Sequence, residues 1–76
     1  MNALTSKEKR ELIKEFSPVP GFVLKLTRMQ FEIIVDEATN IDISKSGSSN
    51  GARFKHLLDT CTDEQIANLL AALRDI

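Results

Sequence analysis

A short capping pattern occurs three times in this chain and limits what the chain can fold into. In each copy a threonine is followed three residues later by a glutamate or a glutamine. The two side chains of such a pair can each accept a hydrogen bond from an otherwise unpaired amide at the start of a helix. The pattern therefore predicts three helix N-termini. The pairs are Thr5 with Glu8, Thr27 with Gln30, and Thr62 with Gln65.

Apolar residues follow these caps with the period of an α-helix. Side chains at positions i, i+3, i+4 and i+7 share one helix face, which is buried when the helix packs. Ile33 lies off its stripe and widens the apolar surface, as a central helix would require. Ala67, Ala71 and Ala72 allow a neighbouring helix to approach the last helix closely. The stripes are Leu12, Ile13 and Phe16; Phe31, Ile34, Val35 and Ala38; Phe54, Leu57, Leu58 and Cys61; and Ile66, Leu69, Leu70 and Leu73.

The size of the chain restricts it to one domain. With 76 residues it buries only about 60% of its unfolded surface. A single cysteine forms no internal disulfide, and one cysteine with one histidine does not complete a zinc site. We therefore expect an all-α fold over residues 1–76, a compact bundle of four helices plus one short apolar helical segment.

The short apolar segment is the least determined part of that prediction. Pro18 and Pro20 end the first helix, because proline disfavours helical geometry before it and lacks an amide donor. Residues 22–26 follow, and their periodicity does not distinguish a strand from a helical turn. No other part of the chain offers a clear partner strand. We favour a short helix or a turn that packs across the bundle.

Residues 40–51 divide the chain and form its least generic stretch. They hold two of the three glycines and several small hydroxyl side chains, and Asn40 can close the preceding helix in the left-handed conformation. Ser49 or Asn50 is expected to cap the next helix, which begins near Gly51. Exposed amides at a helix start also attract anions, but the P-loop pattern is missing. The possible contacts to a partner or a nucleic acid are Lys45, Ser48, Ser49, Asn50, Arg53, Lys55 and His56.

No catalytic, metal or cofactor motif stands out. His56 and Cys61 lie five residues apart on one predicted helix, about 140° apart in projection, so they do not form a nucleophile–base pair. Cys61 is expected to be a core side chain. Glu32 and Asp36 share a helix face and could hold a hard cation with Asp42, but no EF-hand spacing supports this. We therefore predict a protein that is not an enzyme, with no cofactor, no metal and no small-molecule substrate.

The charge and hydropathy of the chain bear on its partners and location. Ten Lys and Arg balance eleven Asp and Glu, which argues against a dedicated nucleic-acid binder. The first ten residues lack the apolar core of a signal peptide, and no apolar run approaches the roughly 20 residues of a membrane span. We expect a cytoplasmic protein that has no membrane partner and whose cysteine is reduced.

Four sequence blocks resemble a known family. They are Leu-Thr-Arg-Met-Gln-Phe at 26–31, Asn-Ile-Asp-Ile at 40–43, Gly-Ser-Ser-Asn-Gly-Ala-Arg-Phe at 47–54 and Leu-Leu-Ala-Ala-Leu at 69–73. Together, over about residues 16–76, they are similar to a small helical domain at the N-terminus of bacterial abortive-infection (antiphage) proteins. The chain departs from that pattern at Asn40, where glycine is favoured, and at Lys55 and Leu57, where the pattern has arginine and phenylalanine.

The resemblance implies that residues 1–76 are the N-terminal module of a longer protein, an accessory or sensing module joined to an effector, with no catalytic residues in this stretch. We therefore expect a non-catalytic interaction or adaptor domain that binds a protein partner or associates with itself. Two alternatives remain open at this point. One is a weak contact to a nucleic acid or nucleotide through residues 45–56, and the other is a small stand-alone regulator.

Overall fold

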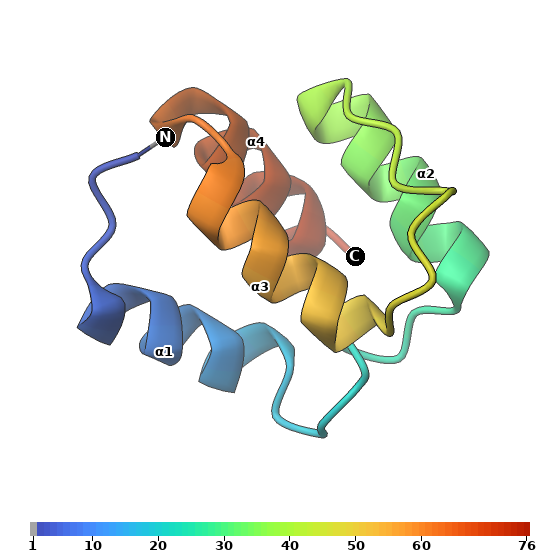
Figure 1. The fold of residues 1–76 in the computed structure, drawn as a ribbon, viewed down its shortest axis with the longest axis horizontal. Helices are drawn as coiled ribbons and strands as arrows, with labels where there is room; N and C mark the ends of the chain where they lie inside the picture. Colours follow the sequence, from blue (N-terminus) through green and yellow to red (C-terminus); the bar gives the residue numbers. More distant parts are fainter. Residues whose placement is uncertain (1) are drawn as a thin grey trace.

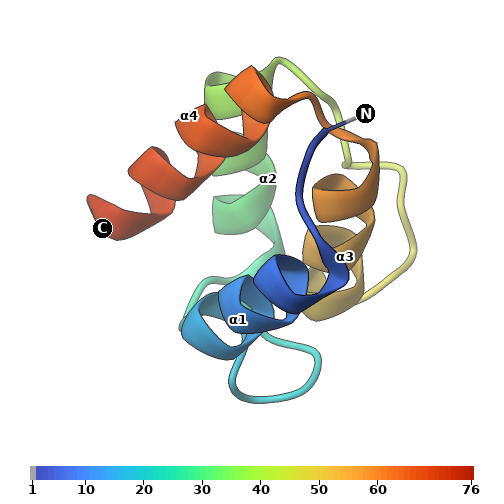
Figure 2. The same cartoon turned by 90° about the vertical axis from the view of Figure 1, so that its left-hand side faces the viewer.

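The computed structural model describes residues 2–76, which form four α-helices and no β-strand. The helices are α1 (Ser6–Phe16), α2 (Arg28–Thr39), α3 (Asn50–Thr60) and α4 (Asp63–Arg74). α2 packs against α4, and α1 packs against α3 (Figures 1 and 2). The predicted all-α bundle of four helices is therefore confirmed.

The helix starts follow the capping pattern of the sequence. All three predicted capping boxes form, with the threonine hydroxyl accepting from the amide three residues on and the Glu or Gln side chain accepting from the threonine amide. Ser49 caps α3, where its hydroxyl accepts from the amide of Ala52 at 3.3 Å. Asn40 closes α2 in the left-handed conformation, with φ of 60°. Local sequence thus fixes where most of the helices begin and where α2 ends.

The core lies where the predicted stripes meet. Phe31 and Phe54 are fully buried, and the ring of Phe54 meets that of Phe16 edge to face at 5.9 Å between centroids. Ile33 is 52% exposed, so the prediction of a central helix with a widened apolar face is wrong for α2. The buried apolar residues are Phe16, Val23, Phe31, Val35, Phe54, Leu57, Leu58, Cys61, Ile66, Leu69 and Leu73.

Residues 22–26 form turns, so the turn that we favoured beside a short helix is confirmed, and the fifth segment is not helical. Leu24 adopts φ of 51°, which is incompatible with a right-handed helix, and its amide donates to the carbonyl of Phe16 at 2.7 Å. This bond ties the segment back to the end of α1. Val23 is fully buried, whereas its neighbours Phe22 and Leu24 are exposed. The segment therefore inserts one side chain into the core and leaves two apolar side chains outside.

The turn after α1 lies against the start of α3 through two glycines. Gly21 has φ of 85°, a conformation that favours glycine. A Cβ added at Gly51 would lie 3.1 Å from the amide nitrogen of Gly21 and 3.2 Å from both its Cα and the hydroxyl of Ser17. Close approach of the two backbones thus requires glycine at position 51.

Gly51→Ala should therefore destabilise the fold, although alanine is the better helix former by about 1 kcal/mol. The added methyl group meets the backbone of Gly21 as well as the hydroxyl of Ser17, and we expect a net loss of about 1–3 kcal/mol in the free energy of unfolding. Urea denaturation measures this. Gly47→Ala is the matched control, because its added Cβ meets nothing within 4 Å. A Gly51→Ala protein at least as stable as the unaltered one would contradict the close packing.

Candidate functional site

The residues predicted as possible contacts gather where the loop of residues 40–49 enters α3, but their roles differ. Ser49 is the helix cap. Asn50 is buried, and its amide donates to the carbonyls of Leu26 at 3.2 Å and Thr27 at 3.3 Å. These bonds join the start of α3 to the start of α2. Both side chains serve the fold rather than a ligand.

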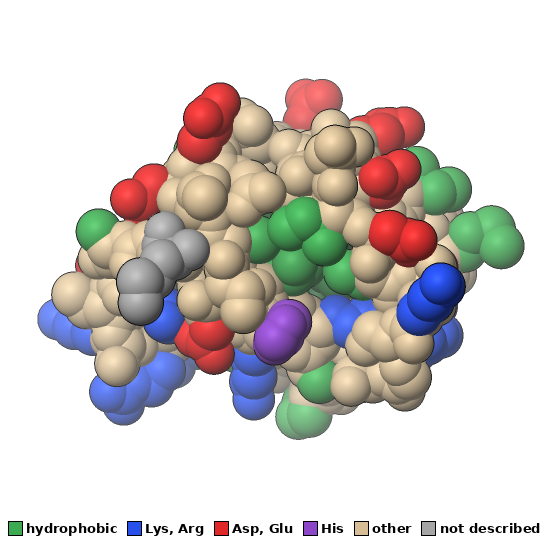
Figure 3. Space-filling model, turned by 45° about the horizontal axis from the view of Figure 1, so that its top comes forward, with side chains coloured by type: hydrophobic (Ala, Val, Ile, Leu, Met, Phe, Trp, Pro, Cys, Tyr) green, Lys and Arg blue, Asp and Glu red, His purple; other side chains and the backbone are tan. Residues whose placement is uncertain are grey.

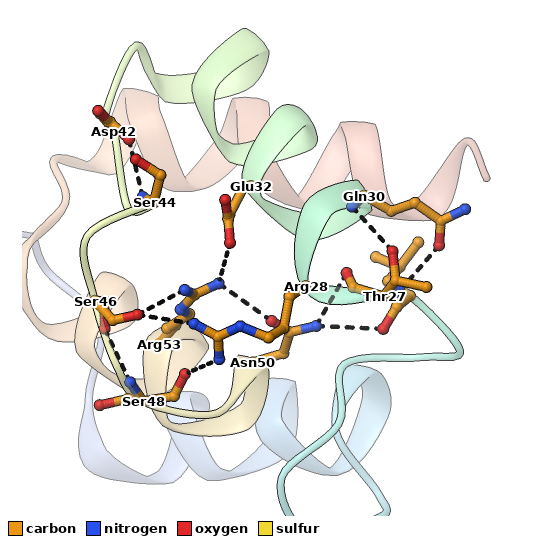
Figure 4. Close-up of polar contacts among 11 residues, drawn as sticks. Thr27, Arg28, Gln30, Glu32, Asp42, Ser44, Ser46, Ser48, Asn50 and Arg53 are labelled. Carbon is orange, nitrogen blue, oxygen red and sulfur yellow. Dashed lines mark hydrogen bonds and ion pairs between the residues drawn. The ribbon is translucent and has the colours of Figure 1, made fainter.

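Arg53 is the most buried charged residue of the described chain, with a side chain only 1% exposed. One terminal nitrogen donates to the carboxylate of Glu32 at 3.0 Å and the other to the carbonyl of Ser46 at 2.7 Å (Figure 4). Its Nε is buried with no hydrogen-bond partner. A buried charge needs such partners, because burial without them is strongly unfavourable. Arg53 thus holds the loop and α2 against α3.

Arg28 completes this cluster, although no pattern in the sequence singled it out. Its two terminal nitrogens donate to the carbonyl of Ser48 at 2.7 Å and to that of Ser46 at 2.9 Å. Figure 4 shows Arg28 from α2 and Arg53 from α3 directed at the same Ser46 carbonyl. Two guanidinium groups therefore fix residues 46–48. No local pattern indicates a contact between residues this far apart in sequence.

A hollow lies between the loop and α3, with a volume of about 440 Å³. Figure 3 shows apolar side chains at its floor beside the single histidine, His56. Arg53 contributes to the wall, but its terminal nitrogens are already bonded to the protein. The hollow is therefore mainly apolar and offers an anion little free positive charge. It is lined by Ile43, Ser46, Ser48, Ala52, Arg53, His56 and Leu57.

The exposed basic residues do not border one common depression. Lys55 does not line this hollow and instead borders a second depression with Pro20 and Gly21, near the end of α1. His56 borders the first hollow, and Lys45 borders neither. A nucleic-acid contact would have to use Lys45, Lys55 and His56 without Arg53. Lys55 and His56 thus border different depressions, and Arg53 is bonded within the fold.

Arg53→Met tests whether this arginine holds the fold. We expect a loss of about 2–4 kcal/mol in the free energy of unfolding, because Glu32 and the Ser46 carbonyl lose a buried partner. Lys55→Met, on the same helix but exposed, should change stability by no more than about 0.5 kcal/mol. Urea denaturation compares the two variants. Equal stability would mean that Arg53 is available for a ligand.

The predicted acidic group also comes together in space, since Glu32, Asp36 and Asp42 border one depression of about 310 Å³. The carboxylate of Glu32 already forms an ion pair with Arg53. Hydrogen bonds from Ser44 lower the pKa of Asp42 below its usual range. Across residues 2–76, no group of three or more His, Cys, Asp or Glu is arranged to hold a metal ion.

Two exposed apolar surfaces were not identified from the sequence. The first, here called the loop surface, consists of Val19, Phe22 and Leu24, which are 58%, 57% and 36% exposed. The second, the α2 surface, consists of Met29 and Ile33, which are 71% and 52% exposed and lie one turn apart on the helix. Single exposed apolar side chains are common on protein surfaces, whereas contiguous exposed apolar groups are less so.

Cys61 lies in the core, as the sequence predicted, and is fully buried. Burial raises the pKa of its thiol, because an ionised sulfur loses hydration there. The thiolate is the reactive form of cysteine. The environment of Cys61 therefore suppresses nucleophilic chemistry at this thiol.

A thiol reagent should label Cys61 at least about a hundredfold more slowly in the folded protein than in denaturant, since labelling requires the fold to open. The rate can be followed by absorbance or by mass. A protein with Cys61→Ser and Ser6→Cys, whose thiol is exposed, should react rapidly in the folded state. Equally fast labelling of Cys61 would show that the core around it is open.

Comparison of the chain with protein families, curated proteins and solved structures finds no match. Among the described helices, none has the length and apolar character needed to cross a membrane. The surface chemistry of the domain itself is consequently the guide to its function.

Proposed function

We propose that this domain is a non-catalytic interaction module that acts through protein–protein contact or self-association. The observation that carries the proposal is the pair of exposed apolar surfaces. The core closes around Phe16, Phe31 and Phe54, while Phe22, the fourth phenylalanine of the chain, stays 57% exposed. Such side chains lose contact with water when a partner covers them, which favours association.

The polar loop supports the same proposal by the bonds it forms. Ser49, Asn50 and Arg53 are directed into the fold, where they cap α3 and hold the loop. The exposed surface that remains is mixed in charge and includes the two apolar surfaces. It suits contact with another macromolecule better than a chemical step on a small substrate.

The resemblance of residues 16–76 to the helical domain of abortive-infection proteins supplies a biological setting. We propose the role of an accessory or sensing module in a bacterial antiphage defence protein. In that role, contact made through the apolar surfaces would connect the domain to its partner or to other copies of itself.

Photo-crosslinking in the host cell tests this function whatever the identity of the partner. A photoreactive phenylalanine analogue would replace Phe22 or Ile33, and for the control it would replace the exposed Glu64 of α4. We expect adducts from positions 22 and 33 and none from position 64. The absence of adducts from both surfaces, with and without phage infection, would contradict the proposal. Adduct mass distinguishes self-association from a different partner.

A further inference from the structure

The two apolar surfaces carry opposite charge in their surroundings. Residues 17–26, which include the whole loop surface, contain Lys25 and no carboxylate. The α2 surface borders the depression that is lined by Met29, Glu32, Ile33, Asp36 and Asp42. Of these carboxylates, Glu32 is paired with Arg53, whereas Asp36 forms no ion pair within residues 2–76.

The same division extends over residues 1–49. Residues 1–28 contain six Lys and Arg against three Glu, whereas residues 29–49 contain four carboxylates against one Lys. In Figure 3 the carboxylates gather over the upper part of the molecule and most Lys and Arg over the lower part. Figure 1 places the loop between α1 and α2 at the lower edge and α2 along the right-hand side. The domain thus has two differently charged ends.

The shapes of the two surfaces also complement one another. The loop surface projects Phe22 from a turn that is anchored by buried Val23 on one side and by the bond from Leu24 to Phe16 on the other. The α2 surface has an open depression of about 310 Å³, at the lower end of the range of about 300–1,000 Å³ for pockets that bind small groups. Because both surfaces are exposed in one molecule, neither covers the other.

We propose that the loop surface of one molecule binds the α2 surface of a second copy of this chain. Phe22 enters the depression beside Met29 and Ile33, and Lys25 faces the carboxylates at its rim. This inference rests on the proposed interaction function and names its partner. A different protein could cover one of the two apolar surfaces. Binding between copies of this chain covers both kinds of surface and brings their opposite charges together.

The charges also disfavour the symmetric alternatives. Two α2 surfaces facing each other would bring Asp36 and Asp42 against their own copies, and two loop surfaces would do the same with Lys25. Such like-charge contacts are unfavourable. The predicted contact therefore joins different surfaces and leaves one of each kind unoccupied at the ends of a dimer. Further addition produces a ring or an open chain.

Sedimentation velocity of the 76-residue chain up to about 1 mM tests the contact, since interfaces this small bind weakly. The unaltered protein should increase in mean mass with concentration, and about 1 M salt should reduce this, because it screens charges beyond about 3 Å. Phe22→Asp and Ile33→Asp should each lower the association constant at least about tenfold. Ile76→Asp, which changes an exposed apolar residue outside both surfaces, should leave association unchanged.

Mixing the two defective variants is the decisive step. Phe22→Asp retains an intact α2 surface and Ile33→Asp an intact loop surface, so an equimolar mixture should form a dimer and no larger species. Circular dichroism should show that all variants are folded. A mixture that stays monomeric, or one variant that dimerises alone, would overturn the head-to-tail contact. An unaltered protein that stays monomeric would also overturn the head-to-tail contact. If crosslinks to a different protein were found in the cell, the proposed interaction function would still hold.

Discussion

The carbonyl oxygen of Ser46 is the point on which the arrangement of this domain depends. It accepts hydrogen bonds from Arg28 at 2.9 Å and from Arg53 at 2.7 Å, which come from two different helices. The Arg53 side chain is 1% exposed, and its charge is compensated by Glu32 and by backbone oxygen. Because an uncompensated charge is unfavourable in the interior, the loop has to stay closed for α3 to keep its place. A glycine- and serine-rich stretch is thereby held in one conformation.

This constraint determines which surface residues remain free to contact another molecule. The polar residues that made the loop resemble an anion site are bonded to the fold, so they are not available together for a ligand. Large apolar side chains remain exposed elsewhere, on the turn after α1 and on α2. The segment that carries the first group contains Lys25 and no carboxylate, whereas carboxylates border the second group. A head-to-tail contact between copies uses both differences at once.

Local patterns in the sequence predict much of this fold. The three capping boxes, the left-handed Asn40 and the stripe of α3 each depend on residues within one or two helical turns. The burial of Arg53 also has a local signal, since positions 50, 53, 54 and 57 share the helix face that includes buried Phe54 and Leu57. Its charge nevertheless favoured a prediction at the surface, among the possible contacts to a partner.

Other features depend on packing between distant segments and have no local signal. Arg28 meets a carbonyl 18 residues further along the chain. Ile33 fits the composition of a central helix, but no other helix covers its side of α2. Residues 22–26 are mostly apolar, and only the folded chain selects Val23 for the core while Phe22 and Leu24 remain outside. Which of these apolar side chains is buried depends on the shape of the cavity between the packed helices.

The bonding of the Arg53 guanidinium group is the most direct test of this account, and side-chain nitrogen NMR measures it. Hydrogen bonds to Glu32 and Ser46 should slow rotation of the group and the exchange of its protons with water. Arg53 should then show separate, slowly exchanging signals for its terminal N–H groups. Arg10, which is exposed and forms no ion pair within residues 2–76, should show averaged signals. Averaged, rapidly exchanging signals for Arg53 would contradict the closed loop.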